Sequence, residues 1–239
     1  MMRSFTFVLT IFAAISATHA AEPGAPLGEK GELLREDDLN RAELGALWRA
    51  SRRGITLNDG YITAEHNEGH PVVTRTKVSF RDAIIELKIR FRGARSVSFV
   101  FDDKETAPTT HSGHLARVTV SPTVLRLGDD KEGGMRLDIL ALKNSGKTED
   151  LAQREQFLVG RTAEVPLQLE QDRWYKLTIE LVGDELRGSI DDKPLVRLKS
   201  PGIAHEIKRE FGPSISGKFV DFDDLKIWAV RAGANPAAK

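Results

Sequence analysis

The chain has 239 residues and no cysteine, which excludes disulfides and thiolate metal sites. Its 35 basic and 35 acidic side chains balance. This balance argues against nucleic acid or an acidic polymer as the main partner, because neutralising phosphates needs a clustered basic surface. The length suits one large β domain or two small ones with a stable core.

The first 20 residues have the pattern of a Sec-type signal peptide. Arg3 precedes an apolar run from Phe5 to Ile15, and small residues at Ala17–Ala20 predict cleavage before Ala21. The run falls short of the roughly 20 apolar residues that a membrane-spanning helix needs, and no later run reaches that length. We therefore expect a secreted or periplasmic protein with no membrane span after signal cleavage.

After the signal, residues 21–31 have the Pro- and Gly-rich composition of a flexible lead-in. We expect one domain over residues 32–230, followed by a disordered tail at residues 231–239. Residues Asp37–Trp48 are expected to form a helical turn or an irregular segment that ends on a buried aromatic side chain.

Short strands and tight turns are predicted through the rest of the chain. The segment Asn58-Asp59-Gly60 predicts one β-hairpin, and Gly183-Asp184 predicts another inside Trp174–Leu198. Apolar residues recur at every second position from Tyr175 to Leu181, the period of a half-buried strand. Thr148–Leu158 has a helical spacing. Further strands are expected at 72–80, 82–92, 96–101, 116–120, 124–127, 135–142, 165–169 and 219–230.

This succession of strands favours an antiparallel architecture over an α/β fold, in which helices would separate parallel strands. The predicted fold class is therefore all-β. We expect a two-sheet antiparallel jelly-roll sandwich with at most one or two short helices.

Several stretches of the chain carry a family resemblance: Leu33–Trp48, Asn58-Asp59-Gly60, Asp82–Arg92, WYKLTIELVGDELRGSIDDKPLV from Trp174, and FVDFDDLKIW from Phe219. Together they resemble the 3-keto-disaccharide hydrolase domain family, which belongs with the concanavalin A-like lectins and glucanases. The resemblance covers Leu33 to Val230, and its motifs mark sandwich strands. It implies a two-sheet jelly roll with carbohydrate as the ligand, usually outside the cytoplasm.

The segment His111-Ser112-Gly113-His114 is the most suggestive for chemistry. Two imidazoles close together can bind a metal or share acid–base work near neutral pH, although loop histidines bonded to carbonyls or solvent are commoner. Two Asp-Asp-Lys repeats at expected strand ends offer carboxylates for a divalent cation such as Ca²⁺, but Asp is also an ordinary turn former. The candidate metal ligands are Asp102, Asp103, Asp129 and Asp130.

The 3-keto reaction needs one positioned base and one group that stabilises negative charge. A ketone at C3 acidifies the C2 proton, so its removal gives an enolate that can expel the C1 substituent. Here the candidate base is His111 or His114. The candidate stabilising group is Lys104, Lys131 or a bound cation.

Candidate substrate-binding residues lie on the outward faces of expected strands. Arg90, Arg92 and Arg117 could present hydrogen-bond donors to sugar hydroxyls, although solvated charge is the default interpretation. Trp228 falls on the face opposite Leu225 and could stack on a sugar ring, although most aromatic residues of such a sandwich belong to its core.

No catalytic constellation stands out in the sequence, so we place glycan binding ahead of 3-keto-glycoside hydrolysis. A structural or adhesion module with no sugar site is a third interpretation, because the fold alone does not specify a function.

Overall fold

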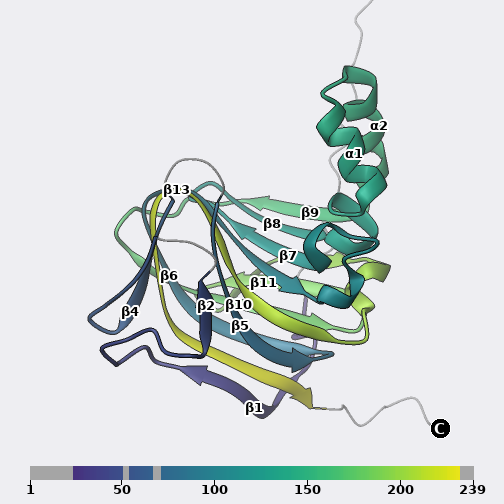
Figure 1. The fold of residues 1–239 in the computed structure, drawn as a ribbon. Helices are drawn as coiled ribbons and strands as arrows, with labels where there is room; N and C mark the ends of the chain where they lie inside the picture. Colours follow the sequence, from purple (N-terminus) through teal and green to yellow (C-terminus); the bar gives the residue numbers. More distant parts are fainter. Residues whose placement is uncertain (1–23, 51–53, 67–70, 232–239) are drawn as a thin grey trace, which may run out of the picture.

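The computed structural model describes residues 24–50, 54–66 and 71–231. Two long strands, β6 (Ala83–Asp102) and β13 (Lys208–Arg231), run antiparallel to each other along most of their length. The first half of β6 pairs with β10 (Trp174–Val182), and its second half pairs with β7 (His114–Val120). The hydrogen-bonded sheet therefore bends over itself into two facing layers (Figure 1).

Each layer is named here after the strand that pairs with β6. In the β10 layer, the additional strands are β1 (Glu29–Asp37), β3 (Ile55–Asn58), β4 (Tyr61–Glu65), β11 (Glu185–Ile190) and β12 (Lys193–Lys199). Their order is β12-β11-β10-β6-β13-β4-β3, and β1 also pairs with β13. In the β7 layer, the additional strands are β2 (Trp48–Ala50), β5 (Val72–Phe80), β8 (Val124–Asp129) and β9 (Thr162–Pro166). Here β9, β8, β7, β6, β13, β5 and β2 follow one another.

The core lies between the layers because each strand points alternate side chains inward. The apolar positions of β10 from Tyr175 to Leu181 are buried, as their spacing predicts. From the other layer, Leu125 and Leu127 are fully buried. A Cβ on Gly188 of β11 would lie only 3.0 Å from Leu125 Cδ2, so the layers pack closely here. The predicted all-β sandwich is confirmed.

The prediction of separate strands at 82–92 and 96–101 was wrong, because β6 runs through both segments. Gly93 and Gly217 have φ values of +89° and +97°, and the β6–β13 register shifts beside Gly217. A Cβ on Gly217 would lie 2.3 Å from the backbone nitrogen of Arg95. Such an irregularity bends a strand without ending it.

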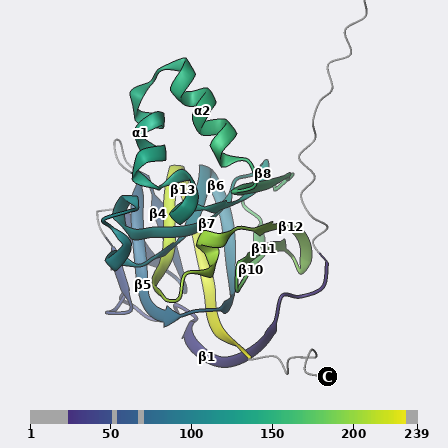
Figure 2. The same ribbon diagram turned by 90° about the vertical axis from the view of Figure 1, so that its right-hand side faces the viewer.

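Within the described residues, two α-helices interrupt the strands, α1 (Leu137–Ser145) and α2 (Thr148–Leu158). They form a hairpin that projects from one end of the sandwich (Figures 1 and 2). The prediction for α2 is confirmed, whereas the strand predicted at 135–142 was wrong. Leucine, alanine and lysine favour a helix there, and Gly146, with φ +69°, ends α1 in a left-handed conformation.

Both predicted hairpins are confirmed, with φ +85° at Gly60 and +57° at Gly183 in their turns. Segment 37–48 contains no helix, and β1 begins at Glu29, inside the expected flexible lead-in. The predicted signal peptide and residues 232–239 of the predicted tail lie outside the described residues. No helix within the described ranges is long and apolar enough to cross a membrane.

Candidate functional site

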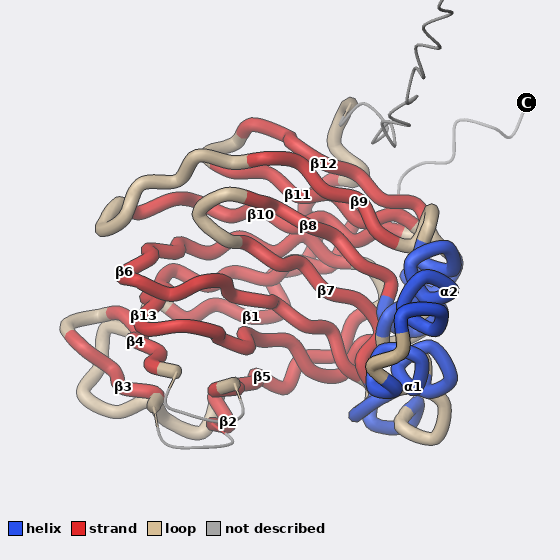
Figure 3. Tube along the Cα trace, turned by 90° about the horizontal axis from the view of Figure 1, so that it is seen from above, coloured by secondary structure: helices blue, strands red, loops and turns tan. Residues whose placement is uncertain are grey.

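The outward face of the β7 layer is polar. On β7, Ala116 and Val118 are buried in the core, and Arg117 and Thr119 therefore point the other way. In the strand register, Arg126 of β8 lies opposite Thr119. The next strand, β9, places Glu164 opposite Arg126 and Thr162 opposite Gly128. Strands β7, β8 and β9 lie side by side (Figure 3). Alternation along them thus gathers arginine, threonine and glutamate on one surface.

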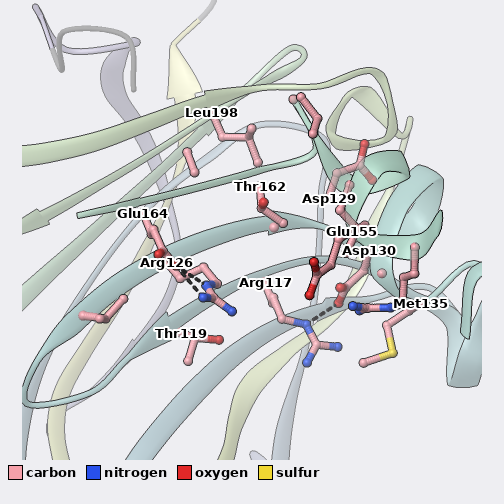
Figure 4. A pocket seen from close by; sticks show the side chains of 18 of the residues that line it. Arg117, Thr119, Arg126, Asp129, Asp130, Met135, Glu155, Thr162, Glu164 and Leu198 are labelled. Atoms are coloured by element: carbon pink, nitrogen blue, oxygen red, sulfur yellow. Dashed lines mark hydrogen bonds and ion pairs between the residues drawn. The ribbon is translucent and has the colours of Figure 1, made fainter. Parts of the chain in front are cut away.

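A cavity of about 1020 Å³ lies over this surface. Arg117, Thr119, Arg126, Thr162 and Glu164 line it from the strands (Figure 4). Helix α2 adds further lining residues: Arg154, Glu155 and Leu158. Among the described residues that line the cavity, none is aromatic. This space can therefore hold a polar ligand through hydrogen bonds and charge, rather than by stacking on a ring.

Ion pairs fix two of the cavity's arginines. Nε of Arg126 donates to Oε2 of Glu164 at 2.6 Å, and Nε of Arg117 donates to Oδ2 of Asp130 at 2.7 Å (Figure 4). Asp130 is nearly inaccessible to solvent. Burial raises the pKa of Asp130, and this effect outweighs the lowering by the positive charges of Arg117 and His114. The cavity therefore borders a carboxyl group that burial biases towards its protonated form.

His114, the first residue of β7, belongs to a buried polar chain with Asp102, the last residue of β6, and Arg75 of β5. Its Nδ1 lies 2.5 Å from Oδ1 of Asp102, and Nε of Arg75 donates to Oδ2 of the same carboxylate at 2.7 Å. Burial alone would raise the pKa of Asp102, but the His114 hydrogen bond and the Arg75 charge outweigh it and lower the pKa. A carboxylate on Nδ1 orients the imidazole, as in a histidine that acts as a base.

A second carboxylate cluster lies one residue further along the chain. Oδ2 of Asp103 lies 3.1 Å from Nε2 of His205, and its Oδ1 accepts from Nε of Arg209 at 3.1 Å. Burial alone would raise the pKa of Asp103. The hydrogen bonds from His205 and the Glu105 amide, together with the charge of Arg209, outweigh burial and lower the pKa. The first Asp-Asp-Lys repeat thus directs its two carboxylates to different partners.

The other predicted catalytic residues are spread around these clusters. The ring of His111 lies 5.8 Å from that of His114, and His111 is exposed. Nζ of Lys104 donates to the carbonyl of Ser112 at 2.9 Å. Lys131 does not line the cavity. The structure therefore brings the two histidines together and bonds Lys104 to the loop between them.

The four predicted metal ligands do not converge on one point. Asp102, Asp103 and Asp130 are held by the pairs described above. Asp129 is fully buried and accepts hydrogen bonds from the amides of Glu132 and Gly202 and from the hydroxyl of Ser200. Within the part of the chain that the structure describes, no group of three His, Asp or Glu residues is arranged to hold a metal ion.

Three predicted substrate-binding residues lie away from the cavity, because they belong to the β10 layer. Nε of Arg90 and Nε of Arg92 donate to Oδ2 of the buried Asp221 at 2.8 and 2.7 Å. The Arg90 guanidinium also lies 4.6 Å from the Trp174 ring centroid. The Trp228 ring is covered by Lys30, whose Nζ lies 3.8 Å from the ring centroid. Only Arg117 of the four predicted binding residues lines the cavity.

Sequence reasoning missed several polar residues of this region. Thr119 and Arg126 alternate with buried residues along β7 and β8, and Glu164 alternates with half-buried residues along β9. This outward alternation was the signal that could have found them. Arg75 gave no such signal, because its partner Asp102 lies 27 residues away and the pairing depends on the tertiary fold.

No protein-family model matches this sequence, and no curated protein sequence matches it. Solved structures with a similar fold are known. The carbohydrate-binding module CBM66 from Bacillus subtilis has a TM-score of 0.51 and 13% identity, covering 77% of this chain and 96% of its own. A laminarinase from Flavobacterium sp. UMI-01 has a TM-score of 0.56 and 9% identity, covering 82% of this chain and 100% of its own.

A non-specific endo-β-1,3(4)-glucanase of family GH16, SCLam, has a TM-score of 0.57 and 9% identity, covering 87% of this chain and 96% of its own. At such identities the likeness is one of fold. The chain is therefore an antiparallel β-sandwich of the jelly-roll type that these carbohydrate-binding and GH16 proteins share.

Proposed function

We propose that this chain is an exported carbohydrate-binding domain and that the cavity over β7, β8 and β9 is its glycan site. The observation that carries the proposal is the set of charged and hydroxyl side chains that line a cavity of about 1020 Å³ on the outward face of one layer. Arginine, threonine and glutamate side chains offer donors and acceptors that match the hydroxyl groups of a sugar.

Two further points support this function. Arg117 and Arg126 are held by Asp130 and Glu164, so their remaining donors are already positioned before a ligand arrives. The names of the structural neighbours include a carbohydrate-binding module and two glucan-degrading enzymes. The Asp102–His114 pair lies beside the site, but His114 is not one of its lining residues, so binding stays ahead of catalysis.

The test is a glycan panel measured by calorimetry with the mature chain and two matched variants. Arg126→Gln removes a cavity arginine whose side chain is 57% exposed and paired with Glu164. Arg173→Gln removes an arginine that is 55% exposed and paired with Glu170, on the β10 layer. We expect Arg126→Gln to weaken glycan binding about tenfold and Arg173→Gln to leave it unchanged. Equal affinities for both variants would place the site elsewhere.

Export is part of the proposal and has its own test. The signal pattern predicts that the secreted or periplasmic protein begins at Ala21. N-terminal sequencing of protein recovered from that compartment should give Ala-Glu-Pro. Recovery of the intact chain only in the cytoplasm would contradict export and leave the glycan site untouched.

The second candidate function is cleavage of 3-keto-glycosides, and the Asp102–His114 pair favours it. His114 would take the C2 proton that the neighbouring ketone acidifies, and the resulting enolate would expel the C1 oxygen substituent, which leaves as an alcohol after protonation. Asp102 would orient the ring through Nδ1, 2.5 Å away.

A substrate assay distinguishes this activity from binding alone. His114→Ala should abolish product release from a 3-keto-disaccharide, whereas His205→Ala, which removes the histidine paired with Asp103, should not. Unchanged turnover in the His114→Ala variant would eliminate the assignment, and so would the absence of any turnover in the native protein.

A further inference from the structure

One arginine of the cavity has no carboxylate partner among the described residues. Arg117 pairs with Asp130, Arg126 with Glu164 and Arg197 with Glu185. Arg154 of α2 also lines the cavity, yet among the described residues it has no ion pair and its buried Nε has no hydrogen-bond acceptor. A buried donor without an acceptor is costly, so such a group is a natural contact for a ligand.

The position of Arg154 places this free charge beside the Asp130–Arg117 pair. Its Nη2 lies 3.5 Å from the point where a Cβ on Gly134 would be, and Oδ1 of Asp130 lies 3.9 Å from the same point. The missing side chain of Gly134 therefore leaves the guanidinium open towards the cavity. Asp130 is already bonded to Arg117 and does not form an ion pair with Arg154.

The neighbouring charges favour an anion. Lys143 of α1 lines the same cavity and, within the described ranges, has no carboxylate partner. Among the described residues, two lining carboxylates have no cationic partner. Glu155 is exposed and can remain hydrated while a ligand binds, and Asp129 already accepts hydrogen bonds from the amides of Glu132 and Gly202 and from the Ser200 hydroxyl. The helical hairpin thus adds two unpaired cations against one solvated carboxylate.

We propose that the cavity binds an acidic saccharide and that Arg154 pairs with the sugar's carboxylate or sulfate group. This inference rests on the proposed glycan site and specifies its ligand class. A guanidinium presents parallel N–H donors that fit either oxyanion in a bidentate manner. The balanced charge of the whole chain argues against an acidic polymer held over a broad basic surface. It does not oppose one anionic group held at a local, partly buried cation.

The test compares three probes of similar length by calorimetry with the mature protein: an oligogalacturonate, the same oligosaccharide after reduction of its carboxyl groups, and a sulfated galactan oligosaccharide. At least one acidic probe should bind ten times more tightly than the carboxyl-reduced probe. The two acidic probes distinguish a carboxylate ligand from a sulfate ligand.

Variants assign the preference to Arg154. Arg154→Gln should lower the affinity for the acidic probe about ten times more than the affinity for the reduced probe, and so abolish the preference. Lys147→Gln removes a positive charge just before the same helix, outside the cavity lining, and should change neither. Glu155→Gln should strengthen acidic binding, because it removes the opposing charge.

The outcomes separate this inference from the function on which it rests. Equal binding of acidic and reduced probes, weakened about tenfold by Arg126→Gln, would overturn the acidic preference and leave the glycan site intact. An acidic preference that persists in Arg154→Gln would overturn the role of Arg154. If no saccharide binds, the glycan site and the acidic preference both fail.

Discussion

Oδ1 of Asp102 lies 2.5 Å from Nδ1 of His114, and the other oxygen of this carboxylate holds the Arg75 guanidinium. Both Arg75 and Asp102 are buried, so each charge depends on the other for its solvation. The pair joins β5 to β6 across β13, where Nη1 of Arg75 also donates to the carbonyls of Gly212 and Pro213. The Asp102 carboxylate of β6 thus holds Arg75 of β5 on one oxygen and His114 of β7 on the other.

Asp102→Asn should destabilise the protein by about 3–5 kcal/mol at pH 7, because it leaves the Arg75 charge buried without a counter-ion. The folded-state pKa of Asp102 is lowered, so its contribution is complete above the unfolded pKa and is lost as the pH falls through the folded value. The difference between native protein and variant should therefore shrink below about pH 4. Urea unfolding at pH 7 and pH 3 measures this, and an equal loss at both values would contradict the ionised pair.

Asp130→Asn should show the opposite dependence on pH. Burial raises the folded-state pKa of Asp130, so its stabilising contribution is complete below the unfolded pKa and is lost as the pH rises through the folded value. The stability of Asp130→Asn relative to the native protein should therefore rise from about pH 4 to pH 7. Chemical denaturation across this range tests the sign, and a relative stability that falls with pH would show that Asp130 is ionised more easily in the folded state.

Lys208 provides a test of the pH dependence of stability at alkaline pH. It is fully buried, and burial lowers its pKa to about 8 while Nζ donates to the carbonyls of Arg81 and His205. Between that value and the ordinary lysine pKa, the unfolded chain binds the proton more readily, so stability should rise with pH. Relative to Lys208→Met, the native protein should gain up to about 3 kcal/mol from pH 8 to pH 10.5. A flat difference between the two proteins across that range would exclude the lowered pKa.

Gly188→Ala tests how closely the two layers pack. Its added Cβ would lie 3.0 Å from Leu125 Cδ2, so the substitution should cost about 1–3 kcal/mol in the free energy of unfolding. The control is Gly128→Ala, whose Cβ would lie 3.5 Å from Arg117 Cγ, an ordinary contact. Thermal unfolding should separate the two variants. In a Leu125→Ala background, Gly188→Ala should cost less stability than it does in the native protein, because the side chain that it would contact is gone. Equal stability of both single variants would contradict the packing of β11 on Leu125.

The sequence predicted those elements whose signals are local. Hairpin turns at Gly60 and Gly183 were found because a positive φ requires particular residues within a few positions. The continuity of β6 was missed because Gly93 resembles a strand end, and only its neighbour β13 shows that the strand bends and continues. The helix α1 was missed because Met135, Leu137 and Ile139 also alternate like a strand.

In the candidate site, too, features set by neighbouring residues could be predicted, whereas contacts between residues far apart in the sequence could not. The first Asp-Asp-Lys repeat lies at a strand end, as its sequence suggested. Its partners are distant in sequence: Arg75 is 27 residues from Asp102, and His205 is 102 residues from Asp103. Because these partners satisfy the carboxylates, the repeat forms internal pairs rather than the candidate cation site. That outcome depends on the tertiary fold, which residue spacing does not encode.

Hydrogen–deuterium exchange with the tightest-binding saccharide tests the glycan site most directly. The account predicts slower exchange of backbone amides in β7, β8, β9 and α2, whose residues line the cavity. The amides around Arg90, Arg92 and Asp221 on the β10 layer should be unaffected. Protection confined to those amides, or no protection in the cavity strands at saturating saccharide, would contradict the assignment.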